Sequence, residues 1–158
     1  MADEKKSPLL RVAEIAAREE TGAHPWNPNS QIRGTRLGAP TGLKRTAVNL
    51  FKIPPGKESF IYHSHRYEEE WMYILSGRGI AEIDGVEHEV GPGDFMGFAT
   101  EPPVAHHIRN PYDAELVYLC GAENRPFEMA DFPKLGRRML RSEGAIEIVD
   151  VKAIKPFP

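Results

Sequence analysis

The sequence contains a single cysteine, Cys120, among its 158 residues. An intrachain disulfide is therefore impossible, and this cysteine usage suits a reducing compartment. No apolar window is long enough to span a bilayer. The first residues lack the apolar core and the small-residue cleavage site of a secretory signal. We therefore expect a cytoplasmic protein with no membrane partner.

The chain also lacks a large excess of either charge. It has 20 Lys and Arg against 23 Asp and Glu, for a formal net charge of -3. Proteins that bind nucleic acids usually carry a basic stripe, so we expect no nucleic-acid partner. Internal repeats and low-complexity tracts are missing too. The length fits one domain that can bury a real core.

Glycine and proline, by contrast, are frequent, with fourteen of each. They recur between short apolar runs, a pattern typical of all-β sandwiches and barrels with many tight turns. Asp84-Gly85 is the strongest hairpin signal in the chain. The predicted strands of this β-rich body cover residues 46–53, 59–65, 70–75, 79–83, 86–90, 95–99, 105–110 and 114–120.

The two flanks of this body are harder to assign. Residues 8–20 favour a short helix, although a strand over 10–15 is an alternative. Residues 21–45 suggest a long irregular arm. We expect residues 1–43 to pack on the barrel or on a partner subunit, and residues 122–158 to extend the same domain. In that extension we predict a short helix near 133–141 and a strand at 145–151, which could pair with the N-terminal arm.

Candidate metal ligands cluster on two neighbouring strands of the predicted body. His63 and His65 lie two residues apart, so both point to the same face of one strand. A short turn separates them from Glu68, Glu69 and Glu70, and a hairpin could bring a carboxylate opposite the two imidazoles. Two imidazoles and one carboxylate suit Fe, Mn, Ni, Co or Zn.

A second cluster follows about forty residues later. His106 and His107 lie on a predicted strand after a proline-rich turn. Either histidine could supply a fourth ligand from the far side of a barrel. Two such pieces on separate strands point to a metal site more strongly than one pair of histidines does.

Both stretches resemble the two motifs of the cupin superfamily. The first motif, G-x5-H-x-H-x(3,4)-E-x6-G, is similar to the segment from Gly56 to Gly77, with one extra residue before His63. The second, G-x5-P-x-G-x2-H-x3-N, is similar to the segment from Gly93 to Asn110. There Pro103 replaces a glycine and residue 101 is glutamate rather than proline. The resemblance covers roughly residues 44–121.

This resemblance implies an all-β fold, the double-stranded β-helix or jelly-roll-like barrel of cupins. The N-terminal arm and the short C-terminal helix and strand are predicted from the flanking residues and not from the resemblance. It also implies one divalent metal on His63, His65, Glu70 and His106. Glu70, rather than Glu68 or Glu69, keeps the six-residue distance to Gly77. Asn110 fits the motif with His106 and not with His107.

The expected function follows from this site. The predicted pocket wall is mostly apolar, and we find no pair of inward arginines that would clamp a dicarboxylate or a phosphate. A metal-dependent enzyme acting on a small organic molecule is the first hypothesis, with a dioxygenase favoured over an isomerase or a decarboxylase. A non-catalytic sensor that uses its metal to anchor a ligand is the alternative. The predicted pocket residues are Ile61, Met72, Ile74, Ile108 and Asn110.

The expected assembly is a homodimer. Long arms surround a small barrel, and strand alternation turns Trp71 and Tyr73 away from the metal. Strand exchange between subunits would cover such an outer face. The metal, whether Fe, Mn, Ni or Zn, cannot be chosen from these residues, because affinity follows the availability of late transition ions.

Overall fold

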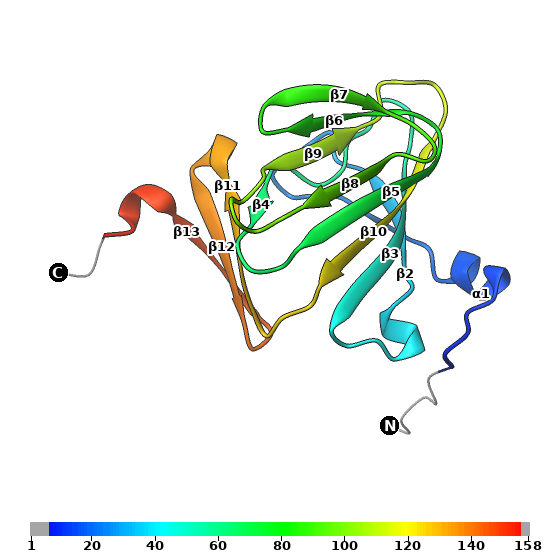
Figure 1. Ribbon diagram of the computed structural model, residues 1–158, viewed down its shortest axis with the longest axis horizontal. Helices are drawn as coiled ribbons and strands as arrows, with labels where there is room; N and C mark the ends of the chain where they lie inside the picture. The colour runs from blue at the N-terminus through cyan, green and yellow to red at the C-terminus, as the bar shows by residue number, and fades with distance from the viewer. Residues whose placement is uncertain (1–6, 156–158) are drawn as a thin grey trace.

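The computed structural model describes residues 7–155, which are built mainly from β-strands (Figure 1). The largest sheet has six strands in the order β1-β2-β3-β10-β5-β8, and a second has three in the order β7-β6-β9. Their bounds are Glu20–Gly22, Ile32–Arg36, Thr46–Ile53, Leu116–Glu123, Glu70–Ser76 and Phe95–Phe98 in the first sheet, and Val86–Val90, Gly79–Ile83 and His106–Arg109 in the second.

One hydrophobic core joins these two sheets. Ile53, Met72, Ile74 and Leu116 come from the six-stranded sheet, and Ile108 comes from the three-stranded sheet; all are at most 6% exposed. Along β5, β8 and β9, buried residues alternate with less buried ones, as expected of two packed sheets. We call the face of the six-stranded sheet that is turned toward this core its inner face. The all-β, jelly-roll-like fold is thus confirmed.

Most strands of the body match their predicted positions. The strands β3, β6 and β7 have the predicted bounds, and β5, β8, β9 and β10 differ by no more than three residues at either end. The predicted strand at 59–65 is wrong in extent, since only β4, Ser64–His65, is regular. The residues before it are joined to the barrel by isolated bridges such as Glu58 with Arg109 and His63 with His106.

The N-terminal flank contributes more regular structure than predicted. The helix α1, Val12–Ala17, lies inside the predicted 8–20 segment, so the strand alternative is wrong. The arm is not irregular throughout, because β1 and β2 extend the six-stranded sheet. The backbone of β3 would otherwise present an open edge, and β2 covers it with a four-residue register. No helix within residues 7–155 is long and apolar enough to cross a membrane.

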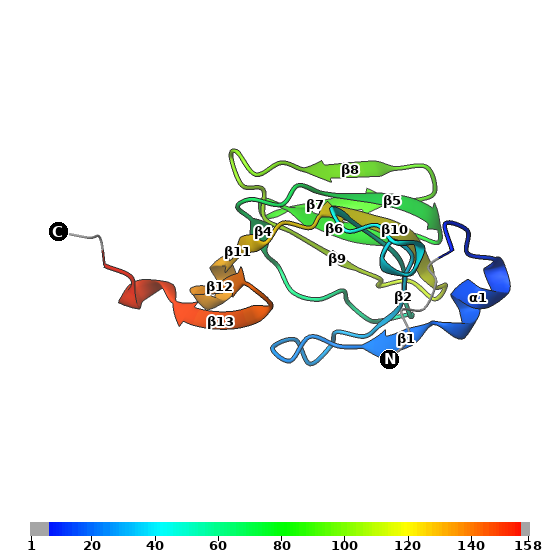
Figure 2. The same cartoon turned by 90° about the horizontal axis from the view of Figure 1, so that it is seen from below.

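The C-terminal flank forms a third sheet, which we call the C-terminal wing. It runs β13-β12-β11-β4, with β11 at Phe127–Phe132, β12 at Arg137–Ser142 and β13 at Ala145–Asp150. Figure 2 shows its outer strands extending away from the barrel. The strand predicted at 145–151 is present, but it pairs with β12 and not with the N-terminal arm.

The helix predicted at 133–141 is wrong. Only Pro133–Leu135 forms a 3-10 turn, and it stops at Gly136, whose φ of 63° lies in the left-handed region. The next six residues become β12 because both of their backbone edges find partners, in β11 and in β13. Ladder pairing on two sides therefore overrides the local helical preference of this segment.

The outer face of the six-stranded sheet carries aromatic side chains, as the alternation in β5 predicts. The Trp71 ring lies across Gly121 of β10, where an added Cβ would come within 2.2 Å of the indole. It also stacks at 6.3 Å on Phe95, which is 64% exposed. Tyr73 is 39% exposed on the same face. The homodimer that would cover this face stays a prediction.

Candidate metal centre

Four side chains from three strands and one loop converge at one end of the barrel. His63 precedes β4, His65 ends β4, Glu70 begins β5 and His106 begins β9. The Oε2 atom of Glu70 lies 3.0 Å from Nε2 of His65, 3.2 Å from Nε2 of His106 and 3.8 Å from Nε2 of His63. The Nε2 atoms of His63 and His65 are 3.1 Å apart. The structure thus brings together the four residues that the sequence singled out.

The Nδ1 atoms of His63 and His106 are hydrogen-bonded to the backbone. Nδ1 of His63 lies 2.7 Å from the carbonyl of Ile61, and Nδ1 of His106 lies 3.1 Å from the carbonyl of Val104. A carbonyl can only accept, so each Nδ1 carries the proton and donates it. Each Nε2 then faces the centre of the cluster.

The backbone makes this arrangement rigid. His63 and His106 form a reciprocal pair of main-chain hydrogen bonds, 3.1 Å and 2.8 Å long, between the loop and β9. The ring of Phe98 stacks on the ring of His106 with a centroid distance of 3.6 Å. Both imidazoles are therefore positioned by the fold before any ligand arrives, which is the condition for a preorganised metal site.

Burial and neighbouring charges shift the pKa values of His63, His65 and Glu70 in different directions. Burial lowers the pKa of His63 to about 3, so its imidazole is neutral near pH 7. Burial also disfavours the cation of His65, but bonds to Glu128 and Glu70 outweigh it and raise its pKa to about 9. Burial alone would raise the pKa of Glu70, yet its bonds to His106 and His65 hold that pKa well below 4.5.

The donor set fits a divalent transition ion. Ligands bound at about 2.0–2.2 Å to one ion lie about 3–3.5 Å apart, close to the 3.0–3.8 Å between these atoms. Three imidazole Nε2 atoms and a carboxylate oxygen face one another, and a divalent cation could bridge such a set of donors. His63, His65, Glu70 and His106 would hold the ion, with carboxylate and imidazole ligands that suit Fe, Mn, Ni or Zn.

The rival residues are engaged by other partners, although the carboxylate of Glu68 lies within 4.8 Å of ligand atoms of His65 and Glu128. Glu68 is buried, but its carboxylate pairs with Arg141 and accepts from the backbone N–H of Arg125. Glu69 is exposed. His107 faces the opposite side of β9, where its Nε2 lies 3.6 Å from Glu58. Alternation along β9 therefore separates His106 from His107, and the ion pair of Glu68 leaves Glu70 as the carboxylate, as the motif spacing implied.

Glu128 is a part of this centre that the sequence reasoning missed. It lies on β11 in the C-terminal wing, is fully buried, and places Oε1 3.3 Å from Nδ1 of His65. The same oxygen accepts a 3.0 Å hydrogen bond from the backbone N–H of Arg66. The alternation of Glu128, Ala130 and Phe132 as buried residues could have signalled an inward-facing strand.

Cys120 touches the centre from inside the barrel. Its Sγ donates to Oε1 of Glu70 at 3.0 Å, leaving Oε2 for the histidines. Burial and the negative charge of Glu70 raise the pKa of the thiol well above 9, so it stays protonated. Cys120 is itself buried.

The predicted pocket wall has a different character. Met72, Ile74 and Ile108 point inward but belong to the packed core. The side-chain amide of Asn110 is hydrogen-bonded to the backbone. Its Nδ2 donates to the carbonyls of Ile53 and Ala114, at 2.9 Å and 2.8 Å, and its Oδ1 accepts from the backbone N–H of Tyr112. Ile61 is half-buried, and its carbonyl accepts from His63.

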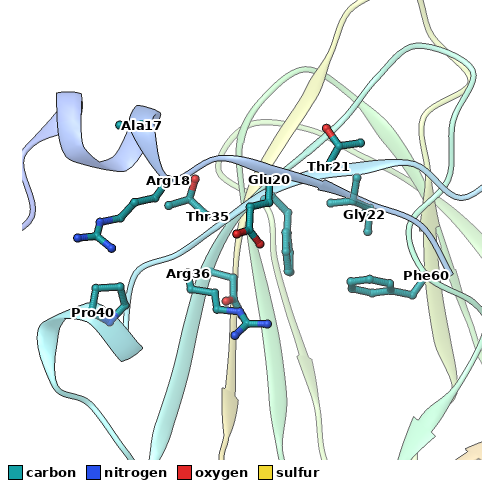
Figure 3. A pocket seen from close by; sticks show the side chains of 13 residues that line it. Ala17, Arg18, Glu20, Thr21, Gly22, Thr35, Arg36, Pro40 and Phe60 are labelled. Atoms are coloured by element: carbon teal, nitrogen blue, oxygen red, sulfur yellow. The ribbon is translucent and has the colours of Figure 1, made fainter. Parts of the chain in front are cut away.

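A ligand-sized hollow lies instead on the inner face of β1, β2 and β3, and we call it the β1–β3 hollow. It encloses about 610 Å³, within the range of roughly 300–1,000 Å³ that is usual for small-molecule sites. Figure 3 shows Arg18, Glu20 and Arg36 along it, with Phe60 at the far end from Arg18. Arg18 and Arg36 are exposed and line this hollow rather than the metal centre, so the expectation that no pair of arginines points into the metal pocket stays a prediction.

Comparison with known proteins identifies a family and two structures that resemble this chain. Residues 49–121 match the family described as Cupin domain. A crystal structure from Acidithiobacillus ferrooxidans, provisionally described as a sugar phosphate isomerase, is 34% identical, with a TM-score of 0.90 and 99% of each chain covered. A sugar phosphate isomerase of the cupin superfamily from Silicibacter pomeroyi has the same fold, with 23% identity, a TM-score of 0.78, and 87% and 92% coverage.

Curated relatives match a shorter stretch. An uncharacterized protein of Methanocaldococcus jannaschii is 35% identical over 79 residues, which is 50% of this chain and 60% of that protein. Protein SchB of Streptomyces halstedii is 34% identical over 89 residues, 55% of this chain and 59% of that protein. The chain thus spans about three fifths of the curated relatives that it matches.

Proposed function

The chain belongs to the cupin superfamily, and on that premise we propose that it is a metal-dependent isomerase of small hydroxylated carbonyl compounds that carry a phosphate. The convergence of three Nε2 atoms and one carboxylate oxygen carries the proposal. The similarity over the whole chain to a protein provisionally described as a sugar phosphate isomerase supports this choice of reaction.

The proposed roles follow from the position of each group. A divalent ion held here would polarise a carbonyl oxygen and make the neighbouring C–H more acidic. The Oε2 atom of Glu70 would bind the ion, while its Oε1 atom accepts a hydrogen bond from the Cys120 thiol. Tyr118, one inner-face position further into the barrel, is 1% exposed, and burial raises its pKa well above 10. The Cys120 thiol and the Tyr118 hydroxyl therefore keep their protons near neutral pH and can donate hydrogen bonds.

The expectation of a dioxygenase depended on an apolar pocket. The apolar residues predicted for that pocket are packed in the core, whereas the β1–β3 hollow carries two arginines and a glutamate. A polar, charged substrate suits that lining better than an apolar one. Oxidative chemistry and non-catalytic ligand binding are therefore the alternatives that the test must separate.

The test begins with protein purified without a histidine tag and analysed for metal. The loaded protein is incubated with aldose and ketose phosphates, and ¹H NMR follows their interconversion while an oxygen electrode follows O₂. Metal-dependent interconversion without O₂ uptake supports the proposal. Uptake of O₂ with a cleaved product would replace it with a dioxygenase, and saturable binding without turnover would replace it with a sensor.

The double variant His63→Ala/His65→Ala is the control. It removes two of the four donors and should abolish both metal retention and turnover while the barrel stays folded by circular dichroism. Retention of one equivalent of metal by this variant would show that the ion lies elsewhere and would overturn the proposed centre.

A further inference from the structure

We infer that the β1–β3 hollow binds the phosphate end of the substrate, with Arg36 and Arg18 as its cationic contacts, while the carbonyl end reaches the metal centre. This inference rests on the proposed function, because it assigns a second part of the same substrate site. The ligand class is a phosphate monoester of a hydroxylated carbonyl compound.

The register of the sheet joins the hollow to the metal centre. Arg36 of β2 is paired with Asn49 of β3, Asn49 with Cys120 of β10, and Cys120 with Met72 of β5. Paired residues in an antiparallel sheet lie on the same face, so Arg36 and Asn49 share the inner face with the thiol that touches Glu70. Three strand spacings, about 14 Å, separate the backbones of β2 and β5.

Small side chains keep the intervening surface open. The inner-face pair one step nearer the metal end is Ala122 with Ala47, and Ala122 is in turn paired with Glu70. Both alanines are only partly buried. For one substrate to span both sites, the reach of the Arg36 side chain must bring its guanidinium within the length of one sugar phosphate from the metal ligands.

The charges of the hollow suit an anion. Seven other arginines form ion pairs, as Arg33 does with Glu115 and Arg138 with Asp131. Within residues 7–155, neither Arg18 nor Arg36 has such a partner, and both line the hollow. Two arginines against the single carboxylate of Glu20 leave a net positive charge. A guanidinium can give two parallel hydrogen bonds to one phosphate, which is the geometry that arginine provides and lysine does not.

The rest of the lining fits the uncharged part of such a ligand. Asn49 offers an amide to sugar hydroxyl groups. Phe60 and Phe51 meet edge to face at 5.9 Å and form an apolar wall. A C–H face of a sugar can pack on such a wall, while its hydroxyl groups turn to the polar side.

Calorimetry with the metal-loaded protein tests the inference directly. Fructose 6-phosphate and fructose are titrated into the wild type, Arg36→Gln, Arg18→Gln and the double variant. Arg45→Gln is the matched control, because Arg45 is exposed, precedes the same strand β3 and does not line the hollow. We expect the wild type to prefer the phosphate ester, and the double variant to lose about tenfold or more of that affinity. The affinity for fructose and the behaviour of Arg45→Gln should be unchanged.

Two results separate this inference from the proposed function. Binding of the phosphate ester that depends on the two arginines, without turnover, would support the hollow as a phosphate site and refute the isomerase. Turnover with equal affinity for both sugars, unaffected by the double substitution, would refute the phosphate site and leave the isomerase intact. Equal and arginine-independent binding in the absence of turnover would overturn both.

Discussion

Glu128 Oε1 lies 3.3 Å from Nδ1 of His65, although the two residues are far apart in the sequence. The contact turns the Nε2 atom of His65 toward Glu70 and links the C-terminal wing to the metal centre. Carboxylates behind metal-bound histidines commonly fix the ring and raise its basicity. Residues outside the matched segment 49–121 therefore complete the centre.

Replacement of Glu128 by glutamine should weaken metal binding by about 10–100-fold, because the amide cannot hold His65 with a charge. Competition with a chromophoric chelator measures the metal Kd. Glu147→Gln on the same wing, where the side chain is exposed, serves as the control and should bind metal like the wild type. Unchanged affinity in Glu128→Gln would mean that Glu128 has only a packing role.

Adjacent histidines on β9 should behave in opposite ways. His106→Ala removes a donor that lies 3.2 Å from Glu70 and should reduce bound metal to well below one equivalent. His107→Ala changes a ring on the other face of the strand, beside Glu58, and should leave the metal content intact. Elemental analysis of both purified variants decides the matter. Metal loss from His107→Ala with retention by His106→Ala would invert the assigned face of β9.

Gly77 should be the least replaceable of the turn glycines. Its φ is 75°, and an added Cβ would stand 2.2 Å from the backbone oxygen of Glu115. Gly77→Ala should lower the free energy of unfolding by about 2–4 kcal/mol, since both strain and a clash with backbone are imposed. Gly85→Ala has a similar φ of 80° but open space, so about 1–2 kcal/mol is expected. Urea unfolding compares the two, and equal losses would show that the clash is relieved.

Asp131 should make the fold sensitive to acid. Burial raises the pKa of this carboxyl, but hydrogen bonds from Arg138 and Arg66 outweigh it and bring the pKa below 3.8. A carboxyl with a lowered pKa stabilises the fold fully above its unfolded pKa, and this stabilisation is lost as the pH falls through the folded pKa.

Asp131→Asn should therefore cost about 1–2 kcal/mol at pH 7, with the difference from wild type shrinking below about pH 4. Urea unfolding at several pH values measures this. Asp113→Asn, at an exposed position with no ion pair in the described part of the chain, should change little at any pH. A difference that stays constant down to pH 3 would show that the lowered pKa is not the source of the stability.

The ligand set was accessible to sequence reasoning because it depends on local geometry. Alternation along a strand places His63 and His65 on one face and separates His106 from His107, whichever strand lies alongside. The Asp84-Gly85 turn was equally local: both residues adopt a positive φ, 46° and 80°, and close the β6–β7 hairpin.

The errors fall where pairing between distant segments decides the outcome. Residues 137–142 became a strand, against the helix predicted from the local sequence, because β11 and β13 lie on either side. The arm became β2 because β3 offered an open edge. Neither partner can be identified from the segment itself.

By itself, the sequence indicated a β-barrel of short strands, and its resemblance to the two cupin motifs indicated the four ligands, because turn chemistry and motif spacing act over short stretches of chain. Only the tertiary structure decided that Glu128 supports His65 and that Arg36 shares an inner face with Cys120. Those relationships depend on how sheets pack and in which register distant strands pair, and the energy of such contacts is set by burial and geometry that no local pattern contains.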